Sequence, residues 1–522
     1  SGSYTGTVPN MVSYFYGFTG PSYFLDTMCS ASATCIHEAV HMLRAGRCKM
    51  ALAGGVSLLL HPQKLIATSQ EHFTTKTAEV IRGYGVGADG TILGEGVGAI
   101  VLKTLADAKR DNDHIYAIIK GTGISNAGVR NGFTVPNPNQ QARAIQEALD
   151  DAGVDPRTIG YIEGHGSGTA LGDPIEIKAL TQVYSKYSSD LQFCPIGTVK
   201  SNIAHLLGAS GLAGIAKVLM QFKHEQLVPS LHAEVLNPNI PFAKTPFYVQ
   251  RELTTWKRLT DSAGLLIPRR AGVTSIGAGG MNSHIILEEY LDTEVGKTSV
   301  DKPELLVFSA MTPLALQNSL KRLHAQMIDE PSLELSNIAF TLQVGKNELP
   351  CRLAIICDNR SSLLSTLLKY SVEVPQNGTR LYYVSTILES DFIVEPELVA
   401  KAISANDLDR LAQYWVNGIK IDWFQLHPKD HPKRASLPSY PFEKIRCWYE
   451  LYPDAPSVTD PLGSKLKLHP FIGVNNSDLS GMRYTTEIYL NEMLDYTYKI
   501  GRNQSVLPLV LPEIFMAAIQ ID

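Results

Sequence analysis

Several features that would place a chain among membrane, secreted or nucleic-acid-binding proteins are missing here. No window approaches the roughly 18 uninterrupted apolar residues that a membrane-spanning helix needs, and the opening run SGSYTG has neither the charged nor the apolar region of a secretory signal. Lys and Arg number 46 against 51 Asp and Glu, and the formal net charge of −5 offers nucleic acid no broad basic surface. We therefore expect a soluble, cytoplasmic protein that binds neither a membrane nor nucleic acid.

Paired cysteines are missing as well. The seven cysteines form no CxxC pair and no zinc-type spacing with histidine. An odd number of cysteines in a chain of 522 residues fits a reducing compartment. The sequence thus predicts no metal site and at most one or two reactive thiols.

The composition is that of a globular chain with several domains, since 44% of its residues are hydrophobic and 19% are charged. Residues 1–290 alternate glycine-punctuated apolar runs with helical patterns, which predicts a layered α/β domain. Residues 291–453 read as a linker and a small α/β subdomain, whose aromatic tail LPSYPF at 437–442 we expect to pack on a neighbour. Residues 454–522 open with another linker and continue in short alternating runs typical of antiparallel sheet.

Cys29 occupies a position that favours reactivity. The run DTMCS at 26–30 follows a strand-like segment at 23–25 and opens a helical pattern that continues to Ala45. At the start of a helix, free N–H groups and partial positive charge stabilise a thiolate and can hold an oxyanion. A buried, inert thiol is the commoner state of a free cysteine, so the position favours a nucleophile without deciding the matter.

Two histidines lie in runs of small residues. His165 belongs to GHGSG at 164–168, after a strand-like run, and His205 ends the run KSNIAH at 200–205. Small neighbours allow backbone or substrate to approach closely. A thiolate that acts on an acyl group needs donors to hold developing negative charge, and two imidazoles can supply them. Each histidine taken alone is equally compatible with a structural role.

A fourth run, GAGGMNSH at 277–284, precedes a strand-like segment. No P-loop Lys-Ser/Thr follows, so a tight turn that presents backbone N–H groups explains it better than a phosphate cradle. The run at 164–168 is not a serine-hydrolase elbow either, because His165 stands where that motif requires glycine.

Together these four runs resemble the ketosynthase domain of modular polyketide synthases, a condensing enzyme of the thiolase-like, layered αβαβα fold. The resemblance covers residues 4–290. DTMCS resembles the nucleophile motif, HGSGT at 165–169 resembles HGTGT, and KSNIAH resembles KSNIGH. Neither departure removes a reactive group.

The resemblance implies a role for each of these residues. Cys29 would accept the growing acyl chain as a thioester, and His165 and His205 would bind the malonyl thioester and support its decarboxylation. Lys200 would keep the histidine region ordered, the backbone N–H groups of Cys29 and Ala278 would form the oxyanion hole, and the terminal glycine loop would contribute Asn282 as a supporting residue.

The resemblance also implies partners. No cofactor would bind directly, because the substrates arrive on the phosphopantetheine arm of acyl carrier proteins, and the domain would pair as a homodimer. The opening third of a ketosynthase would precede Ser1, so we expect a segment of a larger polypeptide. Residues 291–453 resemble the flanking subdomain and linker of synthases whose malonyl groups come from a trans-acting acyltransferase, and 437–448 resembles their YPFxxxRYW tail.

The last region resembles the start of a dehydratase, a β-rich double hot-dog domain. HPFIG at 469–473 is similar to the HPLLG opening. The dehydratase active-site motif aligns best with residues 500–513, which puts Asn503 where the catalytic histidine belongs and Glu513 where glycine does. An amide does not titrate near neutral pH, so the sequence predicts a degenerate domain without dehydration activity.

Three alternatives stay open. A ketosynthase next to a degenerate hot dog also occurs in branching modules of the rhizoxin kind, in which the carbanion adds to the β-carbon of an unsaturated acyl chain and a lactone can follow. A papain-like hydrolase would use Cys29, one histidine and Asn282. A non-catalytic scaffold would only position carrier proteins, a role that we expect for residues 468–522 but not for the ketosynthase.

Overall fold

The computed structural model describes residues 4–77, 79–261, 263–292, 302–386, 392–427 and 431–446, and the backbone of four short strands between 474 and 506. The chain divides into two compact units, Ser1–Glu443 and Lys444–Asp522. Each is described by itself.

A six-stranded sheet forms the centre of the larger part of the first unit, in the order β3-β10-β9-β4-β5-β7. Its strands are β3 (Ala117–Asn126), β10 (Met281–Glu289), β9 (Arg270–Ile276), β4 (Tyr161–Glu163), β5 (Cys194–Gly197) and β7 (Phe247–Val249). Strand β10 runs antiparallel to both neighbours, whereas β9, β4, β5 and β7 run parallel to one another. Because parallel strands end at the same edge of a sheet, the segments that leave β9, β4 and β5 meet there.

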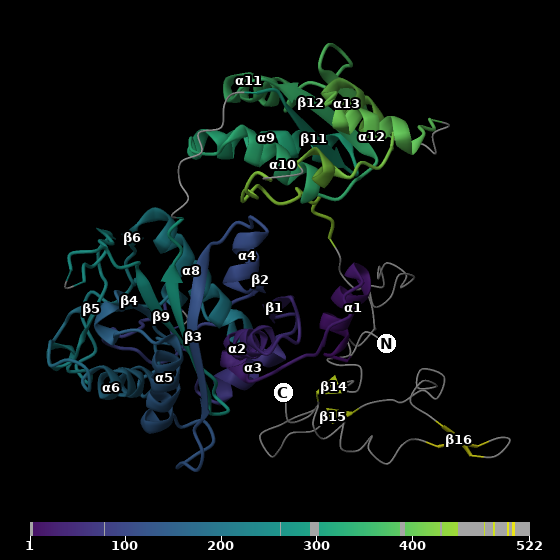
Figure 1. The fold of residues 1–522 in the computed structure, drawn as a ribbon. Helices are drawn as coiled ribbons and strands as arrows, with labels where there is room; N and C mark the ends of the chain where they lie inside the picture. The colour runs from purple at the N-terminus through teal and green to yellow at the C-terminus, as the bar shows by residue number, and fades with distance from the viewer. Residues whose placement is uncertain are drawn as a thin grey trace. The chain divides into compact units, whose positions relative to one another are not determined.

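Helices α5 (Pro138–Ala152) and α6 (Gly172–Tyr184) pack on one face of this sheet (Figure 1). Helix α5 begins where Asn137 accepts the N–H of Asn139 and Pro138 takes the first helical position, and it ends at Gly153, whose φ of 60° closes the last turn. Its apolar stripe joins residues of α6 and the sheet in one core.

Helices α2 (Ala31–Arg44) and α8 (Ser210–His224) pack on the opposite face of the sheet. They approach each other closely at Gly211, where an added Cβ would lie 3.0 Å from the Cβ of Ala33. The absence of a side chain there lets α8 lie directly beside the start of α2, which places the N-terminal end of α2 next to the edge where the parallel strands end.

A two-stranded antiparallel sheet, β1 (Met50–Ser57) with β2 (Gly96–Lys103), lies beyond α2 and α8. Its outer face is apolar and exposed; Val97, for example, is 82% exposed. Helices α1 (Thr7–Tyr16) and α3 (Gln63–Gln70) bury none of their residues. These two helices therefore add nothing to the buried core of the residues that the structure describes.

The remaining short elements of this part connect the layers. They are α4 (Leu105–Arg110), η2 (Pro156–Thr158), η3 (Leu207–Ala209), β6 (Gln226–Leu227), η4 (Phe242–Lys244) and β8 (Thr254–Thr255).

Residues 302–446 contain a second, smaller α/β core within the first unit. Strands β11 (Glu304–Ala310), β12 (Cys351–Cys357) and β13 (Leu381–Val384) form an antiparallel sheet. The helices are α9 (Pro313–Asp329), α10 (Leu335–Val344), α11 (Arg360–Tyr370), α12 (Pro396–Ser404) and α13 (Leu408–Val416), followed by η5 (Trp423–Leu426). One continuous core joins this sheet to its helices.

The aromatic tail covers part of this core. Leu437 and Tyr440 pack against it, and the Tyr440 hydroxyl accepts the N–H of Met311 at 3.0 Å. Phe442 does not follow them, because its side chain is 80% exposed. The expectation that the whole Tyr-Pro-Phe run would be covered is therefore wrong at Phe442, which contacts Tyr440 edge-on but reaches no core.

The second unit contains two short antiparallel pairs: β14 (Val474–Asn475) with β15 (Tyr484–Thr485), and β16 (Tyr498–Ile500) with β17 (Gln504–Val506). Asn503 and Glu513, on which the prediction of a degenerate dehydratase rests, lie outside the described residues. In the described part of the chain, no helix combines the length and hydropathy that a membrane span requires.

Candidate active site

Cys29 lies in the short turn η1 (Met28–Ser30), which leads directly into α2. The hydroxyls of Ser210 and Ser275 donate to the carbonyl of Cys29 at 2.9 and 3.4 Å. Its predicted position at the start of a helix is confirmed. The predicted strand at 23–25 is wrong, because those residues pair with no strand in the part of the chain that the structure describes, and a strand exists only through its hydrogen-bonded neighbours.

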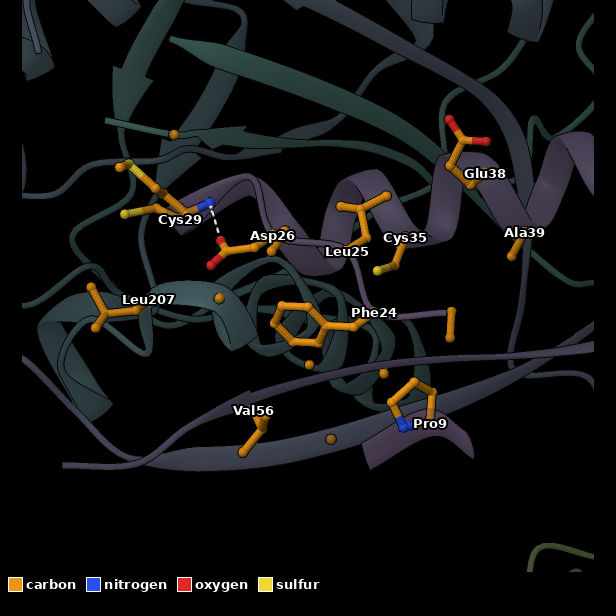
Figure 2. Close-up of a pocket in the computed structure, with 18 of the residues that line it drawn as sticks. Pro9, Phe24, Leu25, Asp26, Cys29, Cys35, Glu38, Ala39, Val56 and Leu207 are labelled. Atoms are coloured by element: carbon orange, nitrogen blue, oxygen red, sulfur yellow. Dashed lines mark hydrogen bonds between the residues drawn. The ribbon is translucent and has the colours of Figure 1, made fainter. Parts of the chain in front are cut away.

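The half-buried Cys29 opens into a cavity of about 1670 Å³ (Figure 2). His165, His205, Ala278 and Asn282 line the same cavity. Its volume exceeds the roughly 300–1,000 Å³ typical of sites for small ligands. All four sequence motifs therefore contribute to one cavity. Of the six predicted site residues, five line it, whereas Lys200 is buried and does not.

The two histidines come from different elements and meet ring to ring. His165 follows β4, and His205 follows the short helix α7 (Lys200–Ile203). Their ring centroids are 5.4 Å apart and the ring planes are nearly perpendicular, at 86°. The end of β9 connects this pair to the cysteine, because Ser275 bonds the Cys29 carbonyl and the next residue, Ile276, donates its N–H to His165.

The hydrogen bonds of the rings fix their tautomer. The Nδ1 atom of His165 accepts the N–H of Ile276 at 3.2 Å, and Nδ1 of His205 accepts the N–H of Leu207 at 3.3 Å. A ring nitrogen that accepts carries no proton, so the proton of each neutral ring is on Nε2. Burial and then the Lys200 cation hold the pKa of both rings well below the usual range, so both are neutral donors near pH 7.

Lys200 is buried next to the histidine loop. Its Nζ donates to the carbonyl of His165 at 2.6 Å. Burial lowers the pKa of Lys200, while the nearby carboxylates of Glu163 and Glu176 act in the opposite direction. The contact fits the predicted ordering role, because it fixes the backbone of the residue whose ring faces the cavity.

The thiol of Cys29 is subject to opposing influences. Burial raises its pKa, and this is the largest effect. Lys200 and hydrogen bonds from the backbone N–H groups of Ala278 and Cys29 to the sulfur act against burial, whereas Asp26 adds to it. The same two N–H groups are the ones predicted as the oxyanion hole, a role that stays a prediction.

Two acids that the sequence analysis missed, Asp173 and Glu176, accept hydrogen bonds from the backbone of the histidine loop at 165–168. Glu176 on α6 accepts the N–H groups of His165 and Gly166, at 2.6 and 2.9 Å, and the hydroxyl of Tyr84 at 3.0 Å. Asp173 accepts the N–H groups of Tyr84 and of Gly168. Burial raises the pKa of Glu176 and takes that of Asp173 to about 7.

A sequence signal for these acids exists. Asp173 and Glu176 stand three residues apart at the start of α6 and share a helical face with the apolar Ile177, Leu180 and Val183, so both point to the buried side. Two carboxyls on the apolar stripe of an amphipathic helix need partners, and the nearest unpaired donors are those of the glycine loop that precedes it.

Asn282 does not form a papain-like arrangement with a histidine. It is buried, and its side-chain amide donates to the Ser125 hydroxyl at 3.2 Å. The contact lies within the sheet, between β10 and β3, and gives no support to the hydrolase alternative. Among the described residues, no three His, Cys, Asp or Glu side chains are close enough to hold a metal ion.

Family comparisons agree with this architecture. Residues 1–108 match the family "Beta-ketoacyl synthase, N-terminal domain", and residues 116–234 match "Beta-ketoacyl synthase, C-terminal domain". Residues 307–373, within the smaller α/β core, match "RhiE-like, KS-MAT linker domain".

Among curated proteins, the polyketide synthase PksL of Bacillus subtilis is 43% identical over 459 residues, which is 85% of this chain and 10% of PksL. The polyketide synthase ThaG of Burkholderia thailandensis is 38% identical over 508 residues, or 93% of this chain and 9% of ThaG. The chain thus spans about a tenth of the length of these relatives.

The matches to solved structures cover most of this chain and most of the solved chain. The ketosynthase from module 6 of the bacillaene synthase of Bacillus subtilis 168 is 34% identical with a TM-score of 0.78, and covers 86% of this chain and 78% of that one. An oxazolomycin ketosynthase domain from Streptomyces albus JA3453 is 35% identical with a TM-score of 0.75, covering 86% and 74%. With the thiolase-like fold around one cysteine and two histidines, these matches show that the chain belongs to the β-ketoacyl synthases of polyketide synthases, a family of acyl-transferring enzymes.

Proposed function

We propose that this chain joins an acyl group on Cys29 to a malonyl-derived carbanion and so lengthens a polyketide chain by two carbons. The observation that carries this proposal is the state of the two rings: His165 and His205 are neutral, and each has Nδ1 occupied by a backbone N–H, so each keeps Nε2–H as a donor. Two such donors beside a cysteine suit an enolate oxygen.

The first half of the reaction is acyl transfer. The Cys29 sulfur attacks the thioester carbon of an acyl group carried on a phosphopantetheine arm, while the backbone N–H groups of Cys29 and Ala278 hold the oxyanion. The carrier sulfur leaves with the proton of the Cys29 thiol. Lys200 favours this step by stabilising the thiolate against the effect of burial.

The second half is decarboxylative condensation. The carbonyl oxygen of a malonyl thioester accepts from Nε2 of His165 and His205, and loss of CO₂ leaves an enolate whose charge the two donors stabilise. The enolate carbon attacks the Cys29 thioester, the bond from carbon to the Cys29 sulfur breaks, and the product leaves as a β-ketoacyl group on the second carrier. Neutral rings suit this step, because they stabilise the enolate without protonating its carbon.

The test uses an acyl carrier protein loaded with a simple acyl chain. Mass spectrometry of the protein should show an acyl adduct on the peptide that contains Cys29, and Cys29→Ala should abolish it. Cys35→Ala is the matched control, since Cys35 lines the same cavity and should leave the adduct intact. An adduct that survives Cys29→Ala would refute the proposal.

Addition of malonyl carrier protein tests the second half. His165→Ala should keep the Cys29 adduct but lose CO₂ release and the β-keto product. The same assay with an α,β-unsaturated acyl chain separates linear elongation from branching: a linear β-keto product supports elongation, whereas a branched or cyclised product establishes conjugate addition in its place.

Carrier proteins are accordingly the partners that we propose, and a trans-acting acyltransferase the source of malonyl groups. The source of malonyl groups rests on the resemblance of residues 291–453 to the linker of such synthases, and the small core and its tail account for the residues described between 302 and 446. A homodimer is proposed from family membership. The dehydratase-like character of 454–522, with Asn503 in place of a catalytic histidine, stays a prediction from the sequence.

A further inference from the structure

The residue before the nucleophile has an unusual backbone. Met28 has a φ of 57°, in the left-handed region that residues with long side chains seldom adopt. A conformation of this kind persists only where neighbouring contacts hold it. In η1, which contains Met28 and Cys29, the direction of the Cys29 side chain depends on that conformation.

Two side chains bond the backbone of this turn: the Ser30 hydroxyl donates to the carbonyl of Thr27 at 2.9 Å, and Asp26 is the one that bonds Met28 itself. The carboxylate of Asp26 accepts the N–H of Met28 at 2.7 Å, the dashed line beside Cys29 in Figure 2. This is an Asx turn, in which a short acid reaches the N–H two residues further along the chain. On its other side the turn lies against the glycine loop: a Cβ added at Gly277 would be 2.4 Å from the carbonyl oxygen of Thr27. A side chain there would push the turn out of position.

The carbonyl side of Cys29 is fixed separately. The hydroxyls of Ser210 and Ser275 donate to its carbonyl oxygen, and these two bonds act on the C-terminal side of Cys29. We propose that Asp26 is a positioning residue for the nucleophile, whose carboxylate holds Met28 in the left-handed conformation and thereby aims the Cys29 sulfur into the cavity. This rests on the proposed role of Cys29.

The charge of Asp26 has a separate effect that helps to test its role. Lys200 on α7 and Asp26 are the charged groups that act on the thiol, and the two neutral histidines line the same cavity; Asp26 raises the pKa of the thiol, while Lys200 lowers it. The Asp26 carboxylate thus fixes the turn but also raises the pKa of the thiol. An uncharged acceptor at the same position would fix the turn without raising that pKa.

Two substitutions in the full chain separate acceptor from charge. Asp26→Asn keeps an oxygen acceptor at the same reach and removes the charge, whereas Asp26→Glu keeps the charge but adds a methylene, so that the carboxylate no longer fits the two-residue turn. Asp155→Asn and Asp155→Glu are matched controls, because Asp155 accepts the N–H of Arg157 at 2.9 Å in an equivalent, exposed turn away from the cavity.

Two readouts follow each variant: the rate of acyl transfer to Cys29 from a loaded carrier protein, and the rate of Cys29 labelling by iodoacetamide across pH. Asp26→Glu should transfer the acyl group about tenfold more slowly, as expected for the loss of one hydrogen bond to a charged group. Asp26→Asn should be clearly faster than Asp26→Glu, and its labelling profile should shift to lower pH. Both Asp155 variants should match the parent in both assays.

Two results would overturn the inference: acyl transfer by Asp26→Glu at the parent rate, or transfer by Asp26→Asn as slow as that by Asp26→Glu. Urea unfolding midpoints for all variants show that each is folded when it is assayed. Failure of the proposed function looks different, because the parent protein itself would then form no Cys29 adduct, while the iodoacetamide profiles would still compare the two Asp26 variants.

Discussion

Replacing Glu176 should impair condensation much more than acylation of Cys29. Glu176 accepts hydrogen bonds from His165, Gly166 and Tyr84, all of which belong to the histidine loop and its support. None of these three hydrogen bonds involves the nucleophile turn, whose own bonds come from Ser210, Ser275 and Asp26. A change at Glu176 should therefore displace the His165 ring, which condensation needs, while the hydrogen bonds that position Cys29 for acylation stay in place.

The size of the effect follows from these three contacts. Glu176→Ala leaves three buried donors without an acceptor, at about 1–3 kcal/mol each, and partial relaxation of the loop should bring the loss in unfolding free energy to about 3–5 kcal/mol. Glu176→Gln keeps one acceptor oxygen and should cost about 1–2 kcal/mol. Because one enolate donor is then misplaced, condensation should slow by about 10²–10³.

The assay separates stability from the two chemical steps. Urea unfolding gives the free energy, single-turnover mass spectrometry gives acylation, and CO₂ release from malonyl carrier protein gives condensation. Glu147→Ala is the control, because the carboxylate of Glu147 pairs with Arg143 at 2.8 Å, one helical turn away, in an ion pair that is partly exposed on both sides and worth about 0.3–0.5 kcal/mol. Glu176→Gln that is folded and condenses at the parent rate would refute the positioning argument, as would an equal loss in both chemical steps.

Three further changes have expected outcomes. Lys200→Met should raise the pKa of Cys29, because it removes the cation that opposes burial, and iodoacetamide labelling of that thiol should move to higher pH; an unchanged profile would contradict this. The pKa of buried His284 is lowered to about 3, so between about pH 6.5 and pH 3 the unfolded chain binds a proton that the folded chain does not. As the pH is lowered through this range, the unfolding free energy should decrease by about 1.4 kcal/mol per pH unit for this residue. His284→Gln should make the acid side of the curve of unfolding free energy against pH less steep, and an equal slope would disprove the assignment. Arg434→Ala should free the segment 431–436 from the region after β2, where Arg434 pairs with Asp113 at 2.6 Å, at a cost of about 1 kcal/mol; limited proteolysis should then cleave that segment faster, and cleavage at the parent rate would exclude the anchoring role.

The residues at the cavity could be predicted because each motif combines a reactive group with an element boundary. Cys29 precedes a helical pattern, His165 follows a strand, and His205 follows the run that contains Lys200. Reactive groups at the ends of parallel strands meet at one edge of a sheet, so order along the chain and the α/β pattern already predict that they converge. The resemblance to ketosynthases then supplied their pairing.

Other parts could not be predicted, for two different physical reasons. Asp173 and Glu176 are recognisable as buried acids, but which donors they accept depends on how α6 packs beneath the loop, a long-range contact that no local pattern encodes. The strand predicted at 23–25 is wrong because local β-propensity does not determine whether another strand is available to pair with it. The expectation that Phe442 would be covered was wrong for a similar reason, since an apolar side chain is buried only where a neighbouring element offers space for it.

Lys200 resolves a conflict between the two halves of the proposed reaction. Acyl transfer needs Cys29 as an anion in a place where burial opposes charge, and condensation needs His165 and His205 as neutral donors. A single buried cation favours both states, because its field lowers the pKa of the thiol and lowers the pKa of both rings. A neutral residue at position 200 would leave burial alone to act, and burial keeps the rings neutral but protonates the sulfur. The carboxylates of Glu163 and Glu176 favour the charged form of Lys200, so Glu176, which holds the backbone of His165, also has a smaller, indirect effect on the nucleophile through this cation.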